Sequence, residues 1–156
     1  MQTRRQVTRI SLVAMTLVLA SAVVAISGCG MMGLQSNMVA FTTQLRATNE
    51  VPPNASVGSG SVDAAFNKDT NLLRWKANFS GLTGPATGAH FHGPAAVGSN
   101  AGVVVPWPGP ISSPLEGSTT LTAAQAADLM AGRWYANVHT AANPGGELRG
   151  QMTARN

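Results

Sequence analysis

Apolar and polar residues alternate most regularly between residues 72 and 80. Every second position there is apolar, and these residues are Leu73, Trp75, Ala77 and Phe79. Because successive side chains of a β-strand point to opposite faces, this period of two predicts a strand with one buried face. Turn-forming residues precede it at 69–71, so segment 58–66 is the expected hairpin partner.

Other short segments with apolar residues are separated by turns rich in Gly, Pro, Asn and Thr. They predict further strands at 39–47, 89–92, 103–105, 118–121, 134–140 and 147–153. We expect Trp75 and Trp134 in the core. Trp107 lies between two prolines, so we expect it in a loop, where it could contact a partner.

One segment predicts a helix instead of a strand. Thr122 is a suitable N-cap, Gln125 three residues later completes a capping box, and Gly132 can end a helix that spans 123–131. Seven or eight short strands with one short helix predict an all-β fold. The specific expectation is an antiparallel Greek-key β-sandwich, immunoglobulin-like or superoxide-dismutase-like in architecture.

The N-terminal segment has a different pattern. Three arginines in the first nine residues precede an uncharged apolar run at 10–26, which is typical of a signal peptide. The run ends in Ile26-Ser27-Gly28-Cys29, which resembles the lipobox of bacterial lipoproteins. The resemblance implies cleavage after residue 28 and acylation of Cys29, which would anchor the chain to a membrane. An ordinary secretory signal or an uncleaved anchor is the alternative.

These features divide the chain into three parts: a signal peptide at 1–28, a lipidated tether at 29–37 and a folded domain at 38–156. Gly30, not Asp, follows the lipobox cysteine. Among bacterial lipoproteins this implies the outer membrane and periplasm where the cell has two membranes, and the cell surface otherwise. Cys29 is the single cysteine, so the folded domain has no disulfide.

The formal net charge of +4 comes mostly from the N-terminal arginines. The rest of the chain has seven basic and six acidic residues, with no basic cluster. We therefore expect no nucleic-acid partner.

All three histidines lie in two of the predicted strands. His90 and His92 are two residues apart, so they share one strand face, opposite Ala89 and Phe91. His139 ends the strand predicted at 134–140, where it shares one face with Tyr135 and Asn137. If the two strands are neighbours, three imidazoles converge, and such a set suits copper or zinc with a fourth position open. The alternative is three hydrogen-bonded histidines without a metal.

Several motifs resemble the CHRD domain, a domain named after chordin that occurs in exported bacterial proteins. The clearest are residues 49–53 (NEVPP), 80–86 (SGLTGPA), 89–95 (AHFHGPA), 137–140 (NVHT) and 143–150 (NPGGELRG). The resemblance covers residues 41–152. It implies an exported domain and no defined catalytic activity.

A more distant similarity is to the copper/zinc superoxide dismutases, which are Greek-key sandwiches. Their copper ligands include a His-X-His pair and a later Val-His, and His90, His92 and His139 occur in that order here. This chain has no bridging histidine, zinc-ligand loop or intradomain disulfide. The resemblance therefore implies a mononuclear copper site at most and disfavours dismutase activity. No Ser or Cys nucleophile with a His and an acid is evident either, so we favour a protein that is not an enzyme.

Two functional hypotheses follow. The first is an envelope lipoprotein that binds one copper or zinc ion through His90, His92 and His139. The second is a structural or interaction module that binds another envelope or extracellular protein without a metal. Glu147 and Arg149 are candidates for contacts that orient the histidines. The simpler alternatives are a surface position for Glu147 and structural hydrogen bonds for Arg149.

Overall fold

The computed structural model describes residues 37–155. The predicted signal peptide, Cys29 and nearly all of the predicted tether lie outside this range, so these remain expectations from sequence. In the described part of the chain no helix has both the length and the apolar character needed to span a bilayer.

The described chain forms an all-β domain with one short α-helix, which confirms the predicted fold class. The strands are β1 (Met38–Arg46), β2 (Ser59–Asn67), β3 (Leu72–Ser80), β4 (Ala86–His92), β5 (Val103–Pro106), β6 (Leu115–Thr120), β7 (Tyr135–Thr140), β8 (Leu148–Gln151) and β9 (Thr153–Ala154). The helices are the 3₁₀ turn η1 (Ala47–Asn49) and α1 (Ala123–Met130). Strands β4 and β6 each begin three residues before the predicted position, because Ala86 pairs with Thr140 and Leu115 pairs with Ala77.

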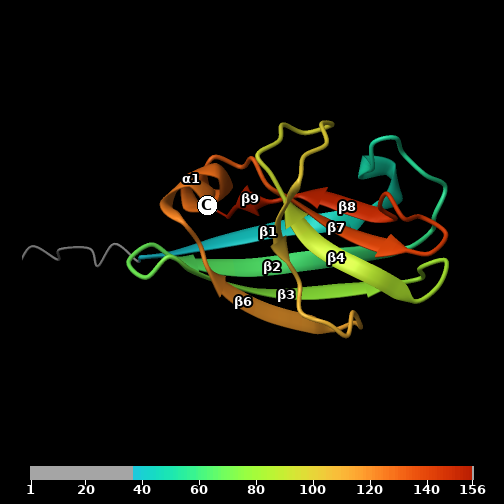
Figure 1. Ribbon diagram of the computed structural model, residues 1–156, viewed down its shortest axis with the longest axis horizontal. Coiled ribbons are helices and arrows are strands. Elements are labelled where there is room, and N and C mark those ends of the chain that lie inside the picture. Colours follow the sequence, from blue (N-terminus) through green and yellow to red (C-terminus); the bar gives the residue numbers. More distant parts are fainter. Residues whose placement is uncertain (1–36, 156) are drawn as a thin grey trace, which may run out of the picture. The chain divides into compact units, whose positions relative to one another are not determined.

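The strands form one antiparallel sheet in the order β5-β4-β7-β8-β1-β2-β3-β6, and β9 also pairs with β1. Greek-key crossovers place β4 beside β7 and β3 beside β6. The two halves of the predicted sandwich are continuous, because Arg46 of β1 pairs with Arg149 of β8. In Figure 1 strand β4 passes across β1, β2 and the end of β3.

Aromatic side chains fill the space between the two halves of the sheet. The ring centroids of Trp75 on β3 and Phe91 on β4 are 5.3 Å apart. Phe91 also contacts Trp107 and Trp134, at 5.1 and 5.8 Å. Trp107 does lie in a loop, but its side chain is only 5% exposed, so the expectation of a surface contact residue is wrong. Ala89 and Phe91 face this core, which leaves the alternate residues of β4 on the outward face.

Helix α1 has the predicted capping box: Thr122 Oγ1 accepts a hydrogen bond from Gln125 N, and Gln125 Oε1 accepts one from Thr122 N. Gly132 follows the helix with a φ of +68°, a left-handed conformation that glycine adopts without strain. Leu129 is buried and joins the helix to the core.

Candidate metal centre

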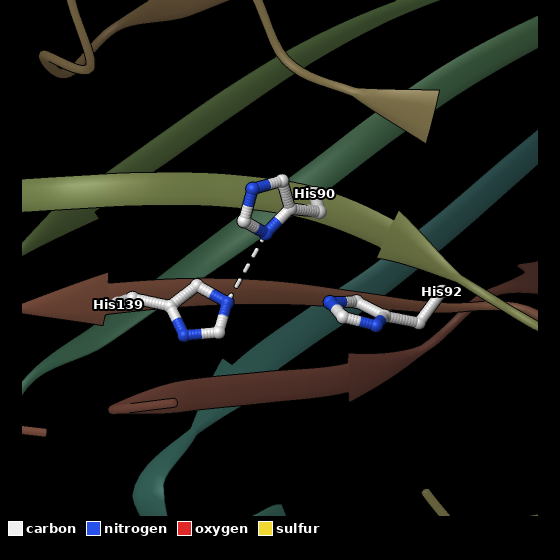
Figure 2. A group of neighbouring side chains, drawn as sticks. All are labelled: His90, His92 and His139. Atoms are coloured by element: carbon white, nitrogen blue, oxygen red, sulfur yellow. Dashed lines mark hydrogen bonds between the residues drawn. The ribbon is translucent and has the colours of Figure 1, made fainter. Parts of the chain in front are cut away.

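The pairing of β4 with β7, which the sequence left open, brings the three histidines to one outward face. His92 lies opposite Tyr135, His90 opposite Asn137, and His139 opposite Gly88. Residues 135, 137 and 139 share one face of β7, so all three rings project from the same side of the two strands. Figure 2 shows the rings pointing toward one another around a common space on this side of β4 and β7.

The ring nitrogens are close enough to serve as ligands of one ion. His90 Nδ1 and His139 Nε2 are 3.2 Å apart, and one nitrogen from each ring lies within 4.8 Å of the others. Tetrahedral coordination at ordinary metal–imidazole lengths needs nitrogens about 3.4 Å apart. The His90–His139 pair already meets this distance, and the widest pair must close by about 1.4 Å.

Backbone carbonyls determine which nitrogen carries the proton in two of the rings. His92 Nδ1 donates a hydrogen bond to Ala101 O, and His139 Nδ1 donates one to Pro144 O, each at 3.0 Å. A carbonyl can only accept, so each neutral ring is protonated at Nδ1 and has its lone pair at Nε2. Metal-binding histidines are oriented by contacts of this kind.

His92 Nε2 is buried and has no hydrogen-bond partner among the described residues. An acceptor lone pair without a partner is costly in the interior of a protein. A metal ion in the space between the rings would satisfy it.

His90 differs from the other two histidines, because its Nδ1 and not its Nε2 faces the other rings. Its Nδ1 faces His139 Nε2, which is already an acceptor, so His90 Nδ1 donates this hydrogen bond when no metal is bound. For His90 to act as a ligand its proton must move to Nε2. The donor set is then Nδ1 of His90 with Nε2 of His92 and of His139.

Gly88 leaves room for these rings. A Cβ atom at this position would lie 3.2 Å from His90 Cε1 and 3.9 Å from His139 Cδ2. The first distance is tighter than an ordinary van der Waals contact, so a side chain here would displace the ring of His90.

The pKa values of all three histidines are lowered, which favours the neutral, metal-binding form. Burial is the largest cause at each. For His90 the neighbouring His139 and His92 lower the pKa further. For His92 and His139 burial outweighs the hydrogen bonds to Ala101 and Pro144, which act in the opposite direction.

Glu147 forms no hydrogen bond to a histidine ring. It does not lie on the surface, as the simpler alternative expected, because its side chain is 0% exposed. It accepts hydrogen bonds from Ser56 Oγ, Thr83 N and Oγ1, Thr140 Oγ1 and Asn143 Nδ2. Burial acts to raise the pKa of Glu147, but the hydrogen bonds from Ser56, Thr140 and Thr83 outweigh it and lower the pKa to about 2. Glu147 therefore holds the turn that carries Pro144.

Arg149 makes the structural hydrogen bonds that the sequence suggested as the simpler alternative. Its side chain is 2% exposed, and it donates to Asn100 Oδ1 at 2.8 Å and to Ser99 O. Its guanidinium carbon lies 3.5 Å from the centroid of the Tyr135 ring.

Sequence reasoning missed two residues of this region. Tyr135 stacks on His92, and the available signal was that Tyr135 shares one face of its predicted strand with His139. Glu50 is buried and accepts a hydrogen bond from Asn137 Nδ2 at 2.8 Å. Burial raises the pKa of Glu50 to about 7, although Arg149 and Asn137 act to lower it. No periodic pattern marked Glu50, because it lies in a loop.

The fold and the site together define an all-β domain with a histidine triad on the outward face of two adjacent strands. The CHRD domain model matches residues 41–152, which is most of the chain. The chain therefore belongs to the CHRD domain family. No curated protein and no solved structure matches it. The similarity to copper/zinc superoxide dismutases accordingly rests only on the order of the residues in the sequence.

Proposed function

We propose that this chain is an exported lipoprotein whose CHRD domain binds one copper or zinc ion through His90, His92 and His139. One observation carries the metal proposal. Three imidazole nitrogens lie within 4.8 Å of one another, and backbone carbonyls keep the proton of His92 and of His139 on Nδ1, so that each Nε2 lone pair faces the other rings.

The donor set favours copper or zinc over harder ions. Neutral imidazoles suit both metals, and sites of this kind bind copper more tightly than zinc at equal availability. Three protein ligands leave one coordination position open for water or another small ligand. We infer a role in holding or transferring copper at the cell envelope.

Metal analysis of the purified mature chain tests this proposal. We expect one equivalent of copper or zinc in the wild type and none in His90→Ala, because two imidazoles cannot retain the ion through purification. Asn78→Ala is the matched control, since Asn78 also lies on an outward strand face but is remote from the triad along the sheet order. Absence of metal from the wild type after reconstitution with copper and with zinc would refute the proposal.

The location at the envelope is a separate part of the proposal, and it depends on Cys29. We expect acylation of Cys29, with anchoring to the outer membrane or the cell surface. Cys29→Ser should release the protein from the membrane fraction. Mass spectrometry of the mature N-terminus would detect the acyl chains directly, and an unmodified Cys29 would contradict this part.

The alternative is a structural or interaction module, and a specific observation favours it too. Each ring already has a hydrogen-bond partner without any ion: His90 pairs with His139, His139 also donates to Pro144 O, and His92 donates to Ala101 O. In that case the histidines stabilise these loops, and the domain binds another envelope or extracellular protein. His90→Ala would then lower stability without any change in metal content.

A further inference from the structure

Tyr135 interacts with His92 directly, by stacking, and indirectly, through Ala101. The two rings lie opposite each other in the β4–β7 pairing and stack with an interplanar angle of 2° and a centroid separation of 4.8 Å. The Tyr135 hydroxyl also accepts a hydrogen bond from Ala101 N at 3.2 Å and donates one to Ala101 O at 3.3 Å. Ala101 O is the same atom that accepts the hydrogen bond from His92 Nδ1.

Arg149 stabilises both Tyr135 and the loop that contains Ala101. Its guanidinium group lies over the Tyr135 ring and is hydrogen-bonded to Asn100 and Ser99, the two residues that precede Ala101. Asn100 also donates to Val51 O at 3.1 Å, which ties this loop to a second one. The carbonyl of Ala101 is thus held by side chains from β7 and β8, not by the loop alone.

We propose that Tyr135 is a positioning residue that fixes both the ring plane and the tautomer of His92. The stack defines the plane of the imidazole, and the hydroxyl holds the carbonyl that keeps the proton on Nδ1. His92 Nε2 then points into the space between the three rings with its lone pair free. This inference rests on the proposed metal site for its functional consequence, but the tautomer itself can be measured without a metal.

Tyr135→Phe separates the two contacts, because it keeps the aromatic stack and removes the hydroxyl. In the metal-free mature chain, long-range ¹H–¹⁵N NMR of the imidazoles should show His92 protonated at Nδ1 in the wild type. In Tyr135→Phe we expect a mixture of both tautomers. His139 is an internal control, since its Nδ1 is held by Pro144 O and should keep its wild-type signals.

The second measurement is copper binding to the same two proteins. Loss of a contact that orients a metal ligand typically lowers affinity by about 10- to 100-fold. We expect a loss of about tenfold in Tyr135→Phe and an altered electron paramagnetic resonance spectrum of bound Cu²⁺, with protein folding unchanged by circular dichroism. If Tyr135→Phe does not fold, Arg149→Lys provides the test, because it keeps the charge and loses the paired hydrogen bonds to the loop.

The outcomes separate this inference from the proposed function. Unchanged His92 signals and an unchanged copper spectrum in the variant would overturn the role of Tyr135, whatever metal the wild type binds. A wild type without metal would refute the proposed function, while the tautomer measurement would still decide whether Tyr135 positions His92.

Discussion

Strands β3 and β7 have the same alternation of side chains, but their outward faces have different surroundings. On β3 the outward residues reach water: Lys76 forms an ion pair with Glu116 at 2.9 Å, and their side chains remain 53% and 69% exposed. On β7 the outward residues Tyr135 and Asn137 are buried. The alternation therefore determines which residues share a face, but not whether that face meets water or another part of the chain.

Loops that fold back over β7 account for the difference. Asn54 donates hydrogen bonds to the backbone of Gly146 and Glu147, which closes one loop against the turn between β7 and β8. A polar group buried in this way is costly unless it is hydrogen-bonded, whereas an exposed ion pair contributes only about 0–1 kcal/mol. Substitutions on the β7 side should therefore have much larger effects than substitutions on the β3 side.

The largest expected effect is that of Gly146→Ala. Gly146 has a φ of +134°, and a Cβ atom there would lie 2.6 Å from both Asn137 Nδ2 and Glu50 Oε1. Backbone strain and overpacking together should lower the free energy of unfolding by about 4 kcal/mol. Gly145→Ala is the matched control, because a Cβ atom at Gly145 would point into open space. Equal losses in the two variants, measured by urea denaturation, would show that the loops pack less tightly over β7 than the structure indicates.

The next effect concerns Glu147 at low pH. Its pKa is lowered from 4.5 to about 2, so the folded state releases a proton that the unfolded state retains between these values. The resulting stability is present above pH 4.5 and is lost as the pH falls through about 2. The loss should be about 3 kcal/mol, and Glu147→Gln should remove most of this pH dependence. Unfolding free energies measured from pH 6 to pH 2 test this. A Gln variant with the same pH profile as the wild type would contradict it, and Glu116→Gln on the exposed face serves as the control.

The smallest expected effect is that of Glu50→Gln, and the contribution of Glu50 to stability depends on pH in the opposite direction to that of Glu147. The pKa of Glu50 is raised from 4.5 to about 7, so its contribution is fully present below pH 4.5 and is lost as the pH rises through 7. At pH 8 the wild type buries a carboxylate, and Glu50→Gln avoids that cost while keeping an acceptor for Asn137. The pKa shift corresponds to about 3 kcal/mol between the two pH values, so we expect the variant to be more stable than the wild type by about 2 kcal/mol at pH 8 and less stable by about 1 kcal/mol at pH 4. Thermal melting at the two pH values measures this, and a variant less stable at both would rule out the buried neutral carboxyl.

The sequence predicted the strands well because their period of two is local. It placed His90 and His92 opposite Ala89 and Phe91, and it grouped His139 with Tyr135 and Asn137. It could not show which strands are neighbours, since the β4–β7 pairing joins residues nearly 50 positions apart. Nor could it show the burial of Glu50, Glu147 and Arg149. That burial depends on how irregular loops pack, and loops have no periodicity to detect.

The N-terminal strand of the domain occupies an interior position in the sheet. Strand β1 pairs with β2, which follows it directly, but its opposite side is completed only by β8 and β9, at residues 148–154. Contacts between segments so far apart in the chain form slowly. During synthesis β1 therefore lacks its second neighbour until residues 148–154 have been added, so the sheet cannot be completed while the chain is still being extended.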